Sequence, residues 1–337
     1  TPVPAGWSLK APITADPGLT RADAAYFPDT GRIYVFGGRP VDSPPGNYNQ
    51  NIYVYDPGAN SWATASTTLT DTRVSNLQAA VLTGPSGPRI YLFGGSPSSG
   101  DPDPTPSDIV RVYDPVSGSL TNADPWPQNP TAVPGGGAVF NNKYYLFGGF
   151  DPLTGGGITL DTIWEFDPMA APGSQWSLKS THMSLDRGYI GTVTIGNYIY
   201  LAGGSQWDGA ALTNETILER YDPTANTIST MAPIPTGSSN WSAYTDGTML
   251  YAAGGFFPTA IDIMYIYDPA ANSWSTGQPM LQAVRNYAST QIGNNQFYAI
   301  GGYDSASAIS NYNQVYSLSI PCLTPTATAT SPAATAR

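Results

Sequence analysis

The chain has 337 residues, of which 11% are charged, and it contains 36 glycines and 32 prolines. A formal net charge of −11 with only 13 Lys and Arg residues argues against a nucleic-acid-binding protein, which would need a basic face. No run of 18 apolar residues is present, so the sequence predicts no membrane-spanning helix.

A short phrase repeats along the chain. The first predicted strand is at residues 6–10. Further along, a strand ends in Tyr34-Val35-Phe36-Gly37-Gly38. The same apolar run with two glycines returns five times, at intervals of 47 to 57 residues between first glycines. The later pairs are Gly94-Gly95, Gly148-Gly149, Gly203-Gly204, Gly254-Gly255 and Gly301-Gly302. Six copies in order indicate a repeat protein.

Each copy predicts four strands and almost no helix. An alternating apolar run such as 191–195 comes first, and the strand ending in two glycines follows. A third strand ends in an aromatic residue and Asp-Pro, as at Asp56-Pro57. Proline ends the strand, and the Asp side chain can accept hydrogen bonds from the turn. The fourth strand often opens near a tryptophan, such as Trp62.

The two ends of the repeat region complement each other. Residues 286–292, 296–301 and 312–319 predict three strands with no fourth, whereas 6–10 is a fourth strand with no first three. We expect the Trp7 strand to complete the last unit, which closes a ring and covers an exposed sheet edge.

This pattern resembles the kelch repeat over roughly residues 6–319. The resemblance implies an all-β fold, a six-bladed kelch-type β-propeller with four antiparallel strands per blade. The predicted domains are a propeller at 1–320 and an extended Thr/Pro/Ala-rich linker or tail at 321–337.

The tail resembles linkers of bacterial surface proteins, which favours a secreted or cell-surface location. Its candidate O-glycosylation sites are Thr324, Thr326, Thr328 and Thr330. The single cysteine, Cys322, lies in this segment and could pair outside the chain, so self-assembly through the tail or Cys322 is one expectation. The alternative is an inert free thiol.

The residue types available for catalysis restrict the chemistry. Some kelch-like propellers are copper-radical oxidases, which need two histidines and a Tyr–Cys crosslink inside the propeller. This chain has one histidine, His182, which we expect at the surface, and one cysteine beyond the last strand. We therefore expect no cofactor. A carbohydrate-active enzyme with paired carboxylates stays an alternative, although no spacing of the Asp residues singles out a pair.

Four arginines share a position relative to the glycines. Arg21, Arg187 and Arg285 lie 16 residues before the first glycine of their repeat, and Arg73 lies 21 before it, displaced by an insertion. We expect all four at the start of the innermost strand, around one mouth of the central channel, where they could bind an anion. The alternative is a structural role in holding neighbouring blades together.

Aromatic residues follow the glycines and are predicted on that same face. The candidates are Tyr48, Trp207, Phe256 and Tyr303, because aromatic rings stack on sugars and anchor protein contacts. The sequence thus favours a non-catalytic extracellular module that recognises a protein or glycan ligand. The alternatives are a structural subunit of an extracellular assembly and a carbohydrate-active enzyme.

Overall fold

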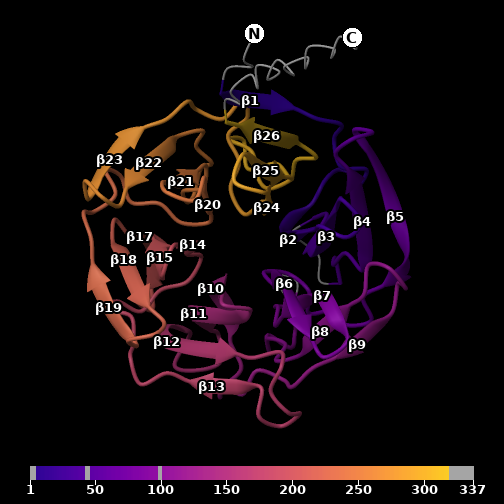
Figure 1. The fold of residues 1–337 in the computed structure, drawn as a ribbon, viewed down its shortest axis with the longest axis horizontal. Helices are drawn as coiled ribbons and strands as arrows, with labels where there is room; N and C mark the ends of the chain where they lie inside the picture. Colours follow the sequence, from indigo (N-terminus) through magenta and orange to yellow (C-terminus); the bar gives the residue numbers. More distant parts are fainter. Residues whose placement is uncertain (1–4, 42–45, 98–100, 319–337) are drawn as a thin grey trace, which may run out of the picture.

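A computed structural model describes residues 5–41, 46–97 and 101–318. Six four-stranded antiparallel sheets stand around a central axis as the blades of a propeller (Figure 1). This confirms the predicted fold class. Within the described residues, no helix is long and apolar enough to cross a membrane. The predictions for residues 321–337, including Cys322 and the tail threonines, lie outside the described residues.

The strands of each blade follow one another from the channel outward. Blade one holds β2 (Thr20–Phe27), β3 (Arg32–Arg39), β4 (Asn51–Asp56) and β5 (Ser61–Thr68). Blade two holds β6 (Gln78–Gly84), β7 (Gly87–Phe93), β8 (Val110–Tyr113) and β9 (Leu120–Asn122). Blade three holds β10 (Val133–Phe140), β11 (Lys143–Asp151), β12 (Ile158–Phe166) and β13 (Trp176–Leu178).

The second half of the ring follows the same plan. Blade four holds β14 (Gly191–Ile195), β15 (Tyr198–Ala202), β18 (Leu218–Asp222) and β19 (Thr227–Thr230), with an extra hairpin of β16 (Ser205–Trp207) and β17 (Leu212–Asn214). Blade five holds β20 (Ser242–Thr245), β21 (Leu250–Ala253), β22 (Met264–Asp268) and β23 (Ser273–Thr276). Blade six holds β24 (Ala288–Ile292), β25 (Gln296–Ile300), β26 (Asn313–Ser317) and β1 (Gly6–Leu9).

Blade six closes the ring with both ends of the propeller. Strand β1 pairs antiparallel with β26, and Trp7 lies opposite Tyr316. The predicted closure by the N-terminal strand is therefore confirmed. Without β1, strand β26 would present an unpaired edge to solvent.

In four of the six blades, a tryptophan binds the chain segment that leads in from the preceding blade. Trp7, Trp62, Trp176 and Trp274 all lie on outermost strands. Each packs on the aromatic residue opposite it on the third strand, with ring centroids 4.9 to 5.4 Å apart. Each indole N–H also donates to a backbone carbonyl of the connection from the preceding blade. The predicted Asp-Pro turns form too, because each Asp carboxylate accepts from the N–H two residues on.

The double glycines lie where one blade contacts the next. Gly203 has a φ of 59°, and a Cβ added there would lie 2.2 Å from the carbonyl oxygen of Ser238. Gly204 donates its N–H to that same oxygen at 2.9 Å. The glycines therefore allow a close backbone approach between neighbouring blades.

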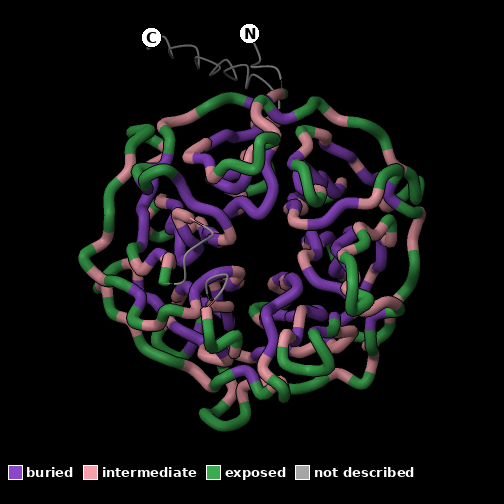
Figure 2. Tube along the Cα trace, turned by 180° about the vertical axis from the view of Figure 1, so that it is seen from behind, coloured by how far each residue is buried: buried purple, intermediate pink, exposed green. Residues whose placement is uncertain are grey.

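The core is divided among the junctions between blades. Each of six buried clusters takes side chains from two neighbouring blades, as where Val35 and Tyr55 of blade one meet Tyr298 and Val315 of blade six. Figure 2 shows buried chain towards the channel and exposed chain along the outer rim. The blades are therefore held together mainly by apolar burial across each junction.

Candidate functional site

One mouth of the channel is encircled by a ring of residues, one from each blade. In each blade, one residue of the innermost strand pairs with the residue that precedes the first glycine. The ring member lies two positions before that innermost-strand residue. The members of this mouth ring are Arg21, Asn76, Pro134, Tyr189, Asn240 and Asn286. All except Pro134 have a positive φ, between 53° and 59°. Asparagine adopts this left-handed conformation more readily than most residues, which suits it to three of the positions.

Backbone hydrogen bonds join neighbouring members of the mouth ring. The N–H of Arg21 donates to the carbonyl of Asn286, and the N–H of Asn76 donates to the carbonyl of Arg21, both at 2.8 Å. Asn286 donates to Asn240 at 2.8 Å, and Asn240 to Tyr189 at 3.2 Å. The ring therefore fixes the backbone that presents its side chains at the mouth.

The side chain of Arg21 extends across the mouth. Its Nη1 lies 3.3 Å from Oδ1 of Asn76 and 3.4 Å from the phenol oxygen of Tyr189. Its Cζ lies 5.8 Å from the ring centroid of Tyr303. Arg21 is half-buried, so part of its guanidinium group is accessible from this face.

Arg285 lies beside the same tyrosine. Its backbone N–H donates to the carbonyl of Tyr303 at 3.0 Å, and the N–H of Tyr303 donates back at 2.8 Å. The Arg285 guanidinium stacks 4.4 Å from the centroid of the Tyr303 ring and 5.4 Å from that of Phe257. Its Nε donates to the carbonyl of Pro258 at 3.0 Å. We call Arg21, Arg285, Phe257 and Tyr303 the mouth cluster; Phe257 is its most exposed member, at 36%.

The structure does not assemble all four predicted arginines at this mouth. Arg187 is fully buried, and its Nη2 lies 2.7 Å from Oε2 of Glu219, which is equally buried. Arg73 lies next to Asp71, whose carboxylate also pairs with Arg111 at 2.7 Å. The prediction that all four guanidinium groups line the mouth is therefore wrong for Arg187. This residue lies inside the protein, where Glu219 neutralises its charge.

Unequal hairpins explain the error. In blade one the residue opposite the last residue before the glycines is Asp23, 14 residues before Gly37. In blade four it is Gly191, only 12 residues before Gly203. The same count back from the glycines therefore reaches different structural positions. Pairing register would have identified the equivalent positions, but the sequence does not reveal it.

The predicted aromatic residues lie on the loops that follow the glycines. Tyr48, Trp207 and Phe256 are half-buried, whereas Tyr303 is almost fully buried beneath the arginines. Trp207 belongs to the extra hairpin of blade four, β16–β17. Their contact with a ligand stays a prediction.

His182 and Glu165 lie in ordinary structural surroundings. His182 is exposed, as predicted, and its Nδ1 lies 3.0 Å from a carboxylate oxygen of Asp161. Glu165 is held by Lys143 at 2.7 Å and Lys179 at 2.9 Å.

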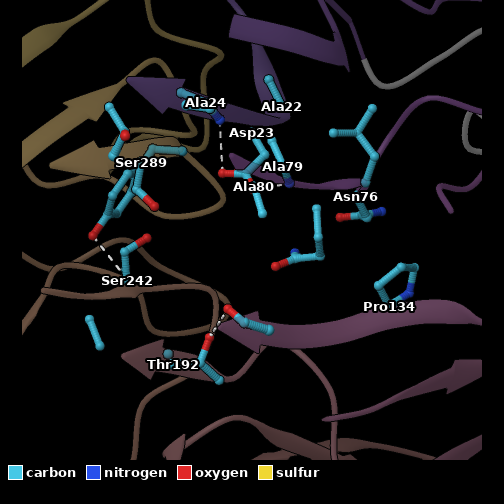
Figure 3. A pocket seen from close by; sticks show the side chains of 18 of the residues that line it. Ala22, Asp23, Ala24, Asn76, Ala79, Ala80, Pro134, Thr192, Ser242 and Ser289 are labelled. Carbon is cyan, nitrogen blue, oxygen red and sulfur yellow. Dashed lines mark hydrogen bonds between the residues drawn. The ribbon is translucent and has the colours of Figure 1, made fainter. Parts of the chain in front are cut away.

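Behind the mouth lies a polar cavity of about 310 Å³ that the innermost strands of all six blades enclose. Figure 3 shows small side chains around it, among them Ala79, Thr192, Ser242 and Ser289. Asp23 is the one carboxylate among its described lining residues. Sequence reasoning missed Asp23. The signal available was a lone acid two residues after Arg21 on an innermost strand.

The carboxylate of Asp23 is held by backbone donors. It accepts from the N–H of Ala24 at 2.9 Å and from the N–H of Ala79, on blade two, at 2.8 Å (Figure 3). Burial raises the pKa of Asp23 to about 7, although these hydrogen bonds favour the charged form.

Comparison with known proteins identifies the repeat. A family model described as the KLHDC2/KLHL20/DRC7 Kelch-repeats domain matches residues 6–204 and 77–302. The chain is 27% identical to the Kelch-like protein terF of Aspergillus terreus over 259 residues, which are 74% of this chain and 52% of that protein. It is 28% identical to Alpha-scruin of Limulus polyphemus over 213 residues, which are 63% of this chain and 22% of that protein. The chain thus spans about half or less of the length of these relatives. The chain belongs to the kelch-repeat family.

Proposed function

We propose that the chain is a non-catalytic extracellular interaction module that binds a protein or glycan at the mouth cluster. The kelch-repeat propeller is a fold commonly used for protein interaction. The observation that carries the proposal is the convergence of Arg21 and Arg285 on Tyr303, with Phe257 exposed beside them. Guanidinium groups stacked on aromatic rings keep donors in their plane, which suits an acidic group of the partner.

The extracellular part of the proposal rests on composition. Lysine occurs only at Lys10, Lys143 and Lys179, and the chain ends in a Thr/Pro/Ala-rich segment. Two close carboxylates in the channel would favour a carbohydrate-active enzyme, but Asp23 is the one carboxylate among the described residues that line it. The structural-subunit alternative depends on the tail, which lies outside the described residues.

The proposal is tested by binding measurements with matched probes. We would compare an oligoglutamate peptide with an oligoglutamine peptide, and sialyllactose with lactose, at low and high salt. We expect an acidic probe to bind more tightly than its neutral counterpart, and its affinity to fall as salt rises, because exposed charges are screened. Arg21→Gln should weaken this binding by about tenfold, the loss of one charge-assisted contact.

Arg32→Gln is the matched control. Arg32 is a partly exposed arginine paired with Asp56 at 3.1 Å, at the far end of the same blade. It should leave binding unchanged. The proposal fails if neither acidic probe binds better than its neutral counterpart. It fails equally if Arg32→Gln costs as much affinity as Arg21→Gln.

A further inference from the structure

The central channel has the size of a small-molecule site. Its volume of about 310 Å³ lies at the lower end of the range of ligand pockets. The innermost strands contribute mostly Ala, Gly, Ser and Thr side chains, which leave this space open. Hydroxyl groups of Ser242 and Ser289 lie around the same cavity as the Asp23 carboxylate (Figure 3).

Asp23 brings a negative charge into this cavity without a neutralising cation. Among the described residues, no Lys, Arg or His lies within ion-pair distance of its carboxylate. The Arg21 guanidinium, two residues away on β2, instead reaches towards Asn76 and Tyr189. A desolvated carboxylate that is held by backbone donors still gains from an opposite charge, because that charge offsets the cost of burial.

We propose that the channel binds a small organic cation, a primary ammonium, which pairs with the Asp23 carboxylate. The carboxylate accepts from the N–H groups of Ala24 and Ala79, and the backbone N–H of Ser289 also favours its charged form. A carboxylate has about four acceptor positions, so it can still accept from a ligand. An ammonium has three donors, so hydroxyl groups that line the same cavity, those of Ser242 and Ser289, are candidates to accept the ones that Asp23 does not. The net charge of −11 favours the approach of a cation.

A divalent metal ion fits this site less well. Calcium needs six to eight oxygen ligands, commonly including several carboxylates. Over the described part of the chain, no three His, Cys, Asp or Glu residues are grouped closely enough to hold a metal ion. One carboxylate with neutral hydroxyl groups matches a monovalent ammonium.

Binding should depend on pH through Asp23. The pKa of about 7 means that the carboxyl group is mostly protonated at pH 6 and mostly ionised at pH 8. Among the described residues, the other titratable or charged groups around it are Arg21 on its own strand and the phenols of Tyr26, Tyr144, Tyr189, Tyr244 and Tyr287. The facing strands β6 and β24 contribute no charged side chain to the lining. Burial raises the pKa of Tyr144, Tyr244 and Tyr287, so these phenols stay neutral in this range.

Isothermal titration calorimetry with two amines and their neutral counterparts tests the proposal. The probes are ethanolamine against ethylene glycol and 1,4-diaminobutane against 1,4-butanediol, with the full chain. We expect an amine to bind and its diol not to bind. The affinity should be about tenfold weaker at pH 6 than at pH 8, with proton release at pH 6, because the ammonium binds the ionised carboxylate.

Two variants distinguish a specific role of Asp23 from an effect of the protein's overall negative charge. Asp23→Asn should abolish amine binding, whereas Asp29→Asn, at an exposed acid just beyond the same strand, should leave it unchanged. If Asp23→Asn does not fold, carboxyl carbon NMR of the wild-type chain serves instead. The Asp23 signal should titrate near pH 7 and shift to a lower pKa on saturation with amine. Absent or pH-independent amine binding, or equal binding of the diols, would overturn the proposal that an ammonium pairs with Asp23. The mouth-cluster proposal would stand in that case, because its test uses anionic probes.

Discussion

Arg21 and Tyr189 approach each other across the channel from opposite blades, with Arg21 Nη1 3.4 Å from the Tyr189 phenol oxygen. Both residues belong to the mouth ring and both have left-handed backbones. The contact therefore crosses the mouth of the cavity that Asp23 lines. Its length indicates a weak hydrogen bond, so ligands could displace it at little cost.

Tyr189→Phe should accordingly change the free energy of unfolding by less than about 1 kcal/mol. Tyr287→Phe is the matched comparison, because the Tyr287 hydroxyl donates to Ala253 at 2.7 Å and accepts from Ser242 at 3.1 Å inside the core. It leaves the buried carbonyl of Ala253 and the half-buried N–H of Ser242 without this partner, and should cost about 1 to 3 kcal/mol. Urea unfolding measures both. Equal costs would contradict the view that the contact across the mouth is weak.

Gly203→Ala should destabilise the propeller much more than Gly196→Ala. Both glycines have nearly the same φ, 59° and 58°, so both variants carry the cost of a left-handed alanine, about 1 to 2 kcal/mol. At Gly203 the new Cβ also meets the Ser238 carbonyl oxygen, whereas nothing lies within 4 Å of it at Gly196. The difference between their thermal midpoints measures the blade contact alone. Similar midpoints would mean that the junction can move aside.

Glu219→Gln should cost about 3 to 5 kcal/mol in unfolding free energy, because it leaves the buried Arg187 guanidinium without its counter-charge. Arg32→Gln removes one partner of a partly exposed surface pair and should cost less than about 1 kcal/mol. Chemical denaturation of the two variants compares them directly. A small effect of Glu219→Gln would show that water reaches Arg187 and that its charge is accessible after all.

The sequence predicted what depends on local chemistry. The glycine pairs and the Asp-Pro turns led to the blades, since each of these signals acts within a few residues. The closing strand followed from counting the strands that the two ends of the repeat region lack. Predicting the channel mouth required knowledge of the strand pairing. Arg21 and Arg285 both contact Tyr303 because of hairpin lengths and pairing register. Arg187 instead forms a buried ion pair with Glu219, 32 residues further along the chain. Asp23 escaped notice because nothing in its own strand shows that five other strands surround it.

Acid should weaken the fold through Glu165. Burial alone would raise the pKa of this carboxyl group, but hydrogen bonds from Lys143, Lys179 and Tyr145 outweigh it and lower the pKa to about 2. A lowered pKa in the folded state stabilises the protein above the unfolded value of 4.5, and this contribution is lost as the pH falls towards 2. Glu165→Gln should therefore cost about 3 kcal/mol at pH 7. The cost should shrink between pH 4.5 and 2, as urea unfolding can follow. A cost that is independent of pH would contradict the assignment.

Ring closure by β1 should make Trp7 one of the most sensitive positions in the chain. Its side chain is 8% exposed and packs 5.4 Å from the Tyr316 ring, and its indole N–H donates to the carbonyl of Gln278 at 3.1 Å. Trp7→Ala should lower the unfolding free energy by about 3 to 5 kcal/mol.

Leu9→Ala on the same strand provides the control, because Leu9 is 54% exposed. It should change stability by no more than about 0.5 kcal/mol. Hydrogen exchange should show faster exchange of β26 amides in Trp7→Ala alone, since β26 is the strand that β1 covers. If the β26 amides keep their protection in Trp7→Ala, the strand edge is guarded by something other than β1, and closure does not depend on the N-terminal tryptophan.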